Sequence, residues 1–517
     1  MYFEQFYLGC LAHASYMLGS EGEAAVVDPQ RDVDLYLAAA QEHGLKIRHI
    51  FETHLHADFV SGHVELARRT GATIYIGARA GAEFPHVPLK DGFELKMGKV
   101  RIQAVETPGH TAESCCLVVT DLETADSPRR RGDAEKDGGK NLAADFADNA
   151  DTAEPGKERG PRGISDSPKM PKAAENDHPQ KPYAVLTGDT LFIGDVGRPD
   201  LSPNLTSQQL AGMLYDSLHT KLLTLPDDVL VYPAHGAGSL CGRNMRADRF
   251  STIGTERMTN YALQIKDRDE FIHQMTANLP AKPEYFSQDA QINRQGATAL
   301  GELPPLMPIT PDALQRFIEQ DVFALDVRPV GEFAAAHVPG SVNIALSGQF
   351  ATWAASVLGL KSRPVLIADT PQQYEEARIR MARVGIEEVR GYLDGGLTAW
   401  RRAGLPVASL PEITVQELEQ RLRSGKIAVL DVRREPEWQA GHIAGATWWP
   451  LDRLKVSPPE VDPDVPLAVH CASGYRSVIA SSLLQRAGMN NVINVKGGFA
   501  DWQKAGFEVE KAEPVSA

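Results

Sequence analysis

Short apolar runs alternate with an amphipathic segment along the first 120 residues or so of the chain. Apolar and β-branched residues cluster at residues 24–29, 74–76, 100–105 and 115–119, and each of these runs predicts a strand. Residues 33–43 carry apolar side chains at helical spacing, which predicts a helix after the first of these strands. The alternation indicates an N-terminal domain that mixes strands and helices.

This pattern breaks between residues 121 and 182. The segment is crowded with Asp, Glu, Lys, Arg, Gly and Pro, and its one aromatic residue is Phe146. Because such a composition cannot bury enough apolar surface to offset the entropy lost on folding, we predict a disordered insertion. The strand pattern resumes at residues 183–186, and a helical and irregular connector is predicted at residues 256–306.

The C-terminal part of the chain repeats itself after about 105 residues. The segment Leu325-Asp326-Val327-Arg328 recurs as Leu430-Asp431-Val432-Arg433, and a Gly-Gly pair followed by a tryptophan recurs as well. The repeat predicts two tandem domains, at residues 307–406 and 412–511, each with strands and helices around a parallel sheet.

The overall composition is that of a globular protein with several domains. The chain has 517 residues, 43% of them apolar and 23% charged, which is enough for three or four domains. The formal net charge of −15 argues against nucleic acid or a membrane as a partner. No window approaches the roughly 18 apolar residues of a membrane span, and no secretory signal pattern begins the chain. Five scattered cysteines predict no disulfide framework, so we expect a cytoplasmic protein.

A motif rich in metal ligands follows the apolar pair at residues 50–51. His54, His56 and Asp58 occupy alternate positions there. Imidazole and carboxylate groups that are presented together from the end of a strand are typical of a metal site. The motif therefore makes these residues candidate ligands.

Three later segments place a histidine or an aspartate where an apolar strand ends in a turn with glycine. The residues are His110, Asp189 and His235. A single histidine is as often structural as functional. The succession of such segments favours ligands that gather at one edge of the sheets, and the sequence predicts a metal centre there.

The order of these segments resembles that of the metallo-β-lactamase superfamily, whose signature is His-x-His-x-Asp-His. Phe59 stands in place of the closing histidine, so one of the superfamily's two metal sites lacks a ligand. Within the superfamily the chain resembles the persulfide dioxygenases more than glyoxalase II. The resemblance covers residues 1–255 apart from the insertion, and it implies an αββα sandwich.

The resemblance to persulfide dioxygenases implies one Fe(II) ion per chain, held by His54, His110 and Asp189. Two imidazoles and one carboxylate on one octahedral face leave positions where O2 and a substrate can bind together. His56 and Asp58 would then orient the ligands or move protons. In the alternative interpretation His56 is a fourth ligand, as in the dizinc hydrolases.

Further residues are candidates for the substrate pocket. His235 belongs to the second metal site of dizinc relatives, and without that site we expect it near the substrate. Arg198 lies in a Gly-Arg-x-Asp element, whose arginine helps to bind an acidic thiol in the family; it either clamps a carboxylate or pairs with Asp200. Cys241 is either close to the iron pocket or a free buried cysteine. Glutathione-using members tend to have an aromatic residue soon after the histidine, and its absence here argues against glutathione persulfide.

The second repeat contains the segment Cys471-Ala472-Ser473-Gly474-Tyr475-Arg476-Ser477 after an apolar strand. Its Cys-x-x-Gly-x-Arg spacing resembles the rhodanese active-site loop. A six-residue loop at the start of a helix directs backbone N–H groups at the cysteine sulfur, and Arg476 adds positive charge. These groups would stabilise the terminal anionic sulfur of a persulfide on Cys471.

The first repeat has no cysteine in the corresponding loop. Alignment of the repeats puts residues 368–373 there, with Asp369 in the position of the cysteine. Because a carboxylate cannot carry sulfane sulfur, we expect an inactive domain that serves as a spacer, a docking surface or part of an interface. Asp326 and Arg328 are expected to hold the fold together.

These features predict a fold class and a function. The fold class is α/β and α+β multidomain, an αββα metallo-β-lactamase sandwich followed by two rhodanese-like α/β domains. The resemblance implies oxidation of a low-molecular-weight thiol persulfide by O2 to sulfite and thiol. Cys471 would then transfer sulfur from a persulfide to sulfite, giving thiosulfate, or in the reverse direction, in the detoxification of sulfide. We expect a homo-oligomer, either a dimer or a tetramer.

Two other functions stay open on the sequence. One is a zinc-dependent thioester hydrolase of glyoxalase II type with an accessory sulfur-carrier domain. The other is a persulfide carrier or sensor without turnover.

Overall fold

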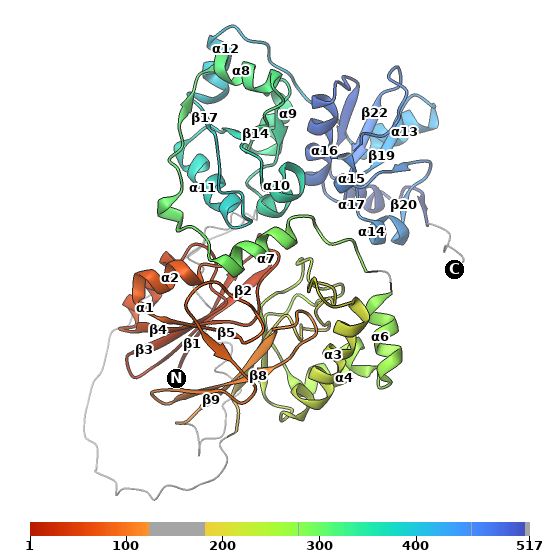
Figure 1. Cartoon of the computed structure of the whole chain (residues 1–517). Coiled ribbons are helices and arrows are strands. Elements are labelled where there is room, and N and C mark those ends of the chain that lie inside the picture. Colours follow the sequence, from red (N-terminus) through yellow and green to blue (C-terminus); the bar gives the residue numbers. More distant parts are fainter. Residues whose placement is uncertain (124–180, 278, 456, 512–517) are drawn as a thin grey trace, which may run out of the picture.

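The N-terminal domain and the two repeats form three neighbouring bodies in the computed structural model (Figure 1). The structure describes residues 1–123, 181–277, 279–455 and 457–511. The predicted insertion therefore lies outside the described residues, apart from its two ends. Within the described residues no helix is long and apolar enough to cross a membrane. All five cysteines are free.

Two sheets pack face to face in the N-terminal domain. The first has the strand order β1-β2-β3-β4-β5-β6 and the second the order β12-β11-β10-β9-β8-β7. The strands of the first sheet are β1 (Tyr2–Leu8), β2 (His13–Ser20), β3 (Glu23–Val27), β4 (Lys46–Glu52), β5 (Thr73–Gly77) and β6 (Val87–Leu89). Those of the second are β7 (Glu94–Met97), β8 (Val100–Glu106), β9 (Cys115–Asp121), β10 (Ala184–Gly188), β11 (Leu230–Pro233) and β12 (Ser251–Thr252). The predicted strands correspond to β3, β5, β8, β9 and β10.

Alternation of side chains along β3 shows how the layers form. Ala25 and Val27 lie in the core between the sheets. Ala24 and Val26 point the other way, into the core beneath α1 (Asp34–Glu42) and α2 (His63–Thr70). On the far side, α3 (Ser207–Thr220) and η1 (Leu222–Thr224) cover the second sheet. These layers confirm the predicted αββα sandwich.

The core of this domain continues beyond residue 255, so the predicted boundary was wrong. The next helices are α4 (Ile253–Thr259), α5 (Tyr261–Gln264) and α6 (Arg268–Thr276). Leu263 and Phe271 are fully buried in one cluster with Leu214 and Val231. Because these helices cover the second sheet, they belong to the domain. The connector follows them and contains α7 (Phe286–Gln295) and η2 (Leu300–Glu302).

Each repeat folds around a parallel sheet, and the two sheets have the same topology. Their strand orders are β13-β17-β16-β14-β15 and β18-β23-β22-β19-β21. The first repeat contains β13 (Pro308–Ile309), α8 (Pro311–Glu319), β14 (Ala324–Asp326), α9 (Val330–Ala335), β15 (Val342–Asn343), α10 (Phe350–Leu358), β16 (Val365–Ile367), α11 (Pro371–Ala382), β17 (Gly391–Leu393) and α12 (Gly396–Arg402).

The second repeat has the same succession of elements and a short additional pair of strands. It contains β18 (Glu412–Ile413), α13 (Val415–Arg423), β19 (Ala428–Asp431), α14 (Glu435–Ala440), β20 (His442–Ile443), β21 (Thr447–Trp448), α15 (Leu451–Leu454), β22 (Leu467–His470), α16 (Tyr475–Arg486), β23 (Val492–Val495), α17 (Gly498–Lys504) and β24 (Val509–Glu510). Strands β20 and β24 pair with each other. The tandem rhodanese-like organisation is therefore confirmed.

The two repeats also share a hydrophobic core. Leu325 and Phe350 of the first repeat are buried in one cluster with Leu430 and Val469 of the second. Within each repeat an ion pair is buried at the corresponding place. Asp326 and Asp431 each accept from an arginine two residues later at 2.6 Å, as expected for residues that hold the fold together.

Buried charges connect the first repeat to the N-terminal domain. The Arg31 guanidinium forms an ion pair with Glu387 and donates a hydrogen bond to the Thr298 carbonyl at 2.6 Å. Only 1% of the Arg31 side chain is exposed, against 25% for Glu387. A second pair joins Arg383 to Asp32, with Nε and Oδ1 2.7 Å apart. The interface therefore depends on paired charges.

We expect Glu387→Ala to lower the free energy of unfolding by about 2 kcal/mol, because it leaves the buried Arg31 guanidinium without its carboxylate. Chemical denaturation of the full chain, followed by tryptophan fluorescence, measures the change. The matched control is Glu388→Ala, which removes an exposed ion pair with Arg363 and should cost less than about 0.5 kcal/mol. Equal effects of the two substitutions would contradict a stabilising role for the buried pair.

Candidate metal centre and cysteine loop

The ends of three strands bring His54, His110 and Asp189 together in the N-terminal domain. The residues follow β4, β8 and β10, and all three are buried. Asp189 Oδ2 lies 3.4 Å from His110 Nε2 and 3.8 Å from His54 Nε2. One potential ligand atom from each residue lies within 4.8 Å of the others. The three predicted iron ligands therefore form one compact group.

Hydrogen bonds from the far side of each ring orient these histidines. His54 Nδ1 lies 3.0 Å from Thr53 Oγ1, and His110 Nδ1 lies 3.0 Å from the Arg198 carbonyl. A carbonyl can only accept, so His110 carries its proton on Nδ1 and presents the lone pair of Nε2. Burial lowers the pKa of both histidines, which keeps the imidazoles neutral as metal ligation requires.

Three buried atoms at the centre of this group have no hydrogen-bond partner among the described residues. They are His54 Nε2, His110 Nε2 and Asp189 Oδ2. Leaving a buried charge or lone pair unsatisfied is costly unless something else binds there. The donor set of two imidazoles and one carboxylate oxygen, converging on one point, fits a divalent metal ion.

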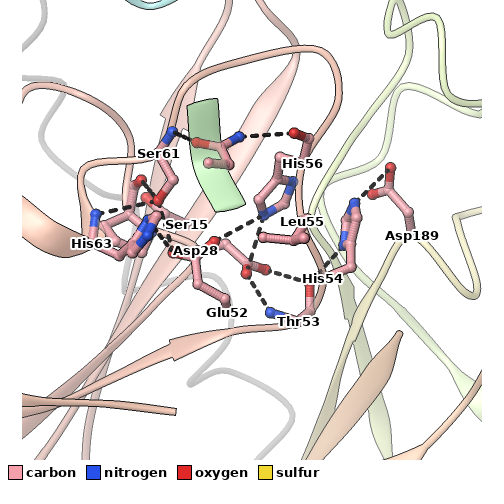
Figure 2. Close-up of polar contacts among 12 residues, drawn as sticks. Ser15, Asp28, Glu52, Thr53, His54, Leu55, His56, Ser61, His63 and Asp189 are labelled. Atoms are coloured by element: carbon pink, nitrogen blue, oxygen red, sulfur yellow. Dashed lines mark hydrogen bonds and ion pairs between the residues drawn. The ribbon is translucent and has the colours of Figure 1, made fainter. Parts of the chain in front are cut away.

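Asp28 supports the loop that carries the first ligand (Figure 2). It accepts hydrogen bonds from the Thr53 backbone N–H at 2.7 Å and from the Thr53 hydroxyl at 2.9 Å. Thr53 in turn faces His54, so the carboxylate fixes the orientation of the ligand through one intermediate residue. The sequence analysis missed Asp28, although it too follows an apolar strand.

His56 lies beside the group of three rather than within it. Its Nε2 is 3.2 Å from Asp28 Oδ1 and 3.8 Å from Glu52 Oε2 (Figure 2). Burial raises the pKa of Glu52 well above its usual range, and the charge of Asp28 adds to this shift. His56 is also one of a second group of potential ligands, with Asp58 and His235, so both interpretations of this residue stay predictions.

Phe59 fills the space beside His56. Its ring is buried, with 1% exposed, and its centroid lies 4.0 Å from that of His13 and 4.4 Å from that of His56. A carbon ring at this position cannot replace the nitrogen ligand of the superfamily signature. His56, Asp58 and His235 still lie near one another, but they lack that ligand.

His235 is held between two carboxylates. Its Nδ1 lies 2.8 Å from Asp189 Oδ1, and its Nε2 lies 3.0 Å from Asp58 Oδ2. Although burial opposes protonation, the two carboxylates raise the pKa of His235 well above its usual range. His235 is hydrogen-bonded to Asp189 Oδ1 through Nδ1, while its Nε2 has no hydrogen-bond partner among the described residues. It holds one oxygen of Asp189 and leaves the other free for the centre.

Arg198 is engaged by the protein itself. Its guanidinium donates to Asp200 at 2.7 and 2.9 Å and to the carbonyls of Leu240 and Pro280. The side chain is 6% exposed. These contacts match the structural alternative rather than a substrate clamp. The contribution of Arg198 to the site comes from its own carbonyl, which orients His110.

Cys241 lies close to the centre, buried in a group with Asp189 and His235. Burial raises the pKa of its thiol well above the usual range, and the nearby charges of Asp58 and Asp189 act in the same direction. It is therefore both near the candidate metal centre and a protonated, buried cysteine.

A small pocket borders Asp58. It is lined by Leu11, Asp58, Gly238, Ser239, Leu240, Tyr285, Gln349 and Thr352. Tyr285 comes from the connector, while Gln349 and Thr352 come from the first repeat. The sequence analysis missed these three residues, because no local pattern marks a residue that reaches a site in another domain.

The predicted loop of the second repeat encloses its cysteine. Cys471 follows β22 and is 1% exposed, and its sulfur accepts a hydrogen bond from the Gly474 N–H at 3.1 Å. Gly474 has a φ of +109°, a conformation that favours glycine and that aims this N–H inward. Ser477 Oγ lies 3.7 Å from the sulfur. The loop, with Ala472 and Ser473 between cysteine and glycine, thus points the Gly474 N–H at the sulfur, and the thiol donates to Ser477 Oγ.

Arg476 is fixed at the rim of this loop by Glu437. Two parallel hydrogen bonds of 2.6 and 2.7 Å join the guanidinium to the carboxylate. Burial acts to raise the pKa of Glu437, but the hydrogen bonds and the charge of Arg476 outweigh it and lower that pKa. Arg476 therefore contributes its positive charge near Cys471 from a fixed position. Tyr475, the first residue of α16, donates its hydroxyl to the Ala345 carbonyl of the first repeat at 2.7 Å.

The equivalent of Cys471 in the first repeat is Ala368, so the predicted match with Asp369 was wrong. Asp431 pairs with His470 in one sheet, and Asp326 pairs with Ile367 in the other. The next residue in each strand is Cys471 or Ala368, and their carbonyls approach Gly498 and Gly396 in the same way. The repeat still lacks a thiol, as expected.

The loop of the first repeat is also shorter and closed by its own side chain. Helix α11 begins at Pro371, three residues after Ala368, whereas α16 begins at Tyr475, four residues after Cys471. Gln373 Oε1 accepts hydrogen bonds from the N–H groups of Asp369 and Thr370 at 2.9 and 3.1 Å. The backbone donors that would hold an anion are therefore already used.

The comparisons agree with these two sites. The metallo-beta-lactamase superfamily model matches residues 8–139, and the rhodanese-like domain model matches residues 310–403 and 414–505. The human mitochondrial persulfide dioxygenase ETHE1 is 26% identical over 279 residues, which are 52% of this chain and 78% of that protein. A hydroxyacylglutathione hydrolase from Anaeromyxobacter dehalogenans is 38% identical over 104 residues, which are 20% of this chain and 40% of that enzyme.

A solved structure extends the likeness over most of the chain. The crystal structure of a metallo-beta-lactamase from Staphylococcus aureus is similar with a TM-score of 0.59 and 26% identity, covering 76% of this chain and 98% of that one. The N-terminal domain therefore has the metallo-β-lactamase fold, and two rhodanese-like domains follow it.

Proposed function

We propose that this protein is an enzyme of sulfur metabolism, an iron-dependent persulfide dioxygenase coupled to a sulfurtransferase. The observation that carries the proposal is the group of His54, His110 and Asp189, whose three orphaned atoms converge while Phe59 stands where a second metal would need a ligand. The similarity to ETHE1 supports the same conclusion.

The chemistry that a bound ferrous ion supplies is the joint binding of O2 and a persulfide sulfur at its open positions. The overall reaction would be RSSH + O2 + H2O giving RSH, sulfite and two protons. The chain contributes the orientation of the ligand rings by Thr53 and by the Arg198 carbonyl. His235 and Asp58 lie between the centre and the pocket, where they can hold or pass a proton.

The second step would take place on Cys471. A persulfide on this residue carries its terminal sulfur in the loop of donors formed by Gly474 and its neighbours. The sulfur lone pair of sulfite attacks that terminal sulfur, the S–S bond breaks, and the Cys471 thiolate leaves as thiosulfate forms. The charge of the reactants, one negative charge on the persulfide and two on sulfite, is conserved in the products.

A zinc-dependent thioester hydrolase of glyoxalase II type is the second candidate. The observation in its favour is the 38% identity to a hydroxyacylglutathione hydrolase over 104 residues. Such a hydrolase uses two metals in the superfamily pattern, and Phe59 removes a ligand of the second one. We therefore favour the dioxygenase.

We expect Cys471→Ser to reduce the rate of sulfur transfer at least about 100-fold, because only the sulfur nucleophile is removed. Persulfide-dependent O2 uptake should stay unchanged. An oxygen electrode and thiosulfate analysis on the iron-loaded full chain measure both. The reciprocal variant, His54→Ala, should lose O2 uptake and keep transfer of sulfur from thiosulfate to cyanide. Loss of both activities in either variant would contradict the division of roles.

Replacing the hydroxyl between Asp28 and His54 should weaken metal binding. For Thr53→Val we expect an affinity lower by about 10- to 100-fold, the usual effect of removing a partner that orients a ligand histidine. A competition titration with a chromophoric chelator gives the value. The control is Thr120→Val, at a buried threonine of β9 away from the centre, which should bind metal like the unmodified chain. An unchanged affinity of Thr53→Val would rule out the orienting role.

A further inference from the structure

Asn293 of helix α7 holds the backbone of the loop that follows β4. Its side chain is buried, with 1% of the residue exposed. The amide nitrogen Nδ2 donates hydrogen bonds to the His56 carbonyl at 2.8 Å and to the Phe59 carbonyl at 2.7 Å. The amide oxygen Oδ1 accepts a hydrogen bond from the Ser61 N–H at 2.8 Å. One side chain of the connector therefore fixes the backbone on both sides of Asp58.

An asparagine suits this position because of its hydrogen-bonding groups. The residues between β4 and α2 belong to no helix or strand, so their buried backbone groups need partners elsewhere. An amide offers two N–H donors and one carbonyl acceptor, which match the two carbonyls and the one N–H of this loop. Since the carbonyls of His56 and Phe59 can only accept, they determine which end of the amide faces them. A carboxylate of the same shape would place an oxygen against both carbonyls.

The inactive repeat supplies a further bond to the same loop. The Val60 N–H donates to the Arg383 carbonyl at 2.7 Å, and the side chain of Arg383 is itself held by Asp32. Helix α7 lies between this repeat and the N-terminal domain (Figure 1). It contacts the repeat at Gly385, where a Cβ on the glycine would be 2.5 Å from Asp289 Oδ1 of the helix. The middle of the loop is thus held from outside the N-terminal domain.

We propose that Asn293 is a positioning residue of the metal centre, and that docking of α7 and binding of the metal support each other. Asp58 lies between the two carbonyls that Asn293 fixes, and its Oδ2 is 3.0 Å from His235 Nε2. His235 is hydrogen-bonded to Asp189, and His54 lies two residues before the first of these carbonyls. The inference rests on the proposed metal centre, but it needs neither O2 nor a persulfide. It gives the inactive repeat a role that needs no thiol.

The first test titrates the metal-free, full-length protein with Co(II) and follows the visible absorption bands, which report the coordination geometry. Asn293→Asp removes both donors and places charge beside two carbonyls. We expect it to lower the affinity for Co(II) about tenfold and to shift the bands, because the ligand loop is displaced. Asn293→Ala removes the donors without adding charge and should act in the same direction.

Gln291→Glu is the matched control, since it makes the same amide-to-carboxylate change at an exposed position of α7. Its affinity and spectrum should equal those of the unmodified protein. Unchanged affinity and bands in both Asn293 variants would overturn the positioning role.

The second test uses the unmodified protein, so it does not depend on the folding of any variant. Because coupling between two sites is reciprocal, bound metal should hold α7 more firmly. We expect Co(II) to slow hydrogen exchange of the α7 amides at least about fivefold and to leave α13, in the other repeat, unchanged. Equal exchange of α7 with and without Co(II) would overturn the linkage.

Two further outcomes separate this inference from the proposed reaction. Failure of the unmodified protein to bind Co(II) would overturn the metal centre and the role of Asn293 together. Binding of Co(II) with the expected effects, but no O2 uptake by the iron-loaded protein, would overturn only the proposed reaction and would support the role of Asn293.

Discussion

The buried carboxylate of Asp189 is the group around which the N-terminal domain is organised. One oxygen is bound by the imidazolium of His235 at 2.8 Å, and the other has no protein donor among the described residues. Burial opposes ionisation, but the charge and the hydrogen bond of His235 lower the pKa of Asp189 well below its usual range. An ionised, half-satisfied carboxylate beside two neutral imidazoles is costly to bury unless a cation binds there.

That constraint explains which neighbours are polar and which are not. Asp28 and the Arg198 carbonyl hold the ligand residues from behind, so the lone pairs point inward. Phe59 fills the other side, where the superfamily builds its second metal site. His54, His110 and Asp189 lie on the side of the centre away from Phe59, as one group of potential ligands. The pocket lies on the side of Asp58, where it is lined by residues of the connector and of the first repeat.

The sequence predicted most of this centre because its chemistry is local. Each candidate ligand follows an apolar strand, so the strand pattern and the residue type marked His54, His110 and Asp189 as candidates, and the resemblance to persulfide dioxygenases singled these three out. The same holds for Cys471, whose loop is a continuous segment. Residues that reach a site from another domain, such as Gln349 and Thr352, carry no such local signal. For Arg198 the sequence left a substrate clamp and a pair with Asp200 open, and the structure shows that Asp200 and neighbouring carbonyls use its donors.

The errors in the fold have the same origin in long-range packing. Helices α4–α6 are short, and only their burial against Leu214 and Val231 shows that they belong to the domain. The match of Asp369 to the cysteine failed by one residue, because the pairing of β14 with β16 sets the register and puts Ala368 at that position. The repeat itself and its missing thiol were still recognised, since neither depends on the exact register.

The most direct test of the account is a titration of metal-free protein with Fe(II) under anaerobic conditions, followed by admission of O2 with a persulfide. The account predicts saturation at one ion per chain and consumption of one O2 for each sulfite formed, counting any sulfite recovered as thiosulfate. Saturation at two ions per chain, or hydrolysis of a glutathione thioester by the zinc-loaded protein with no O2 uptake by the iron-loaded one, would contradict it.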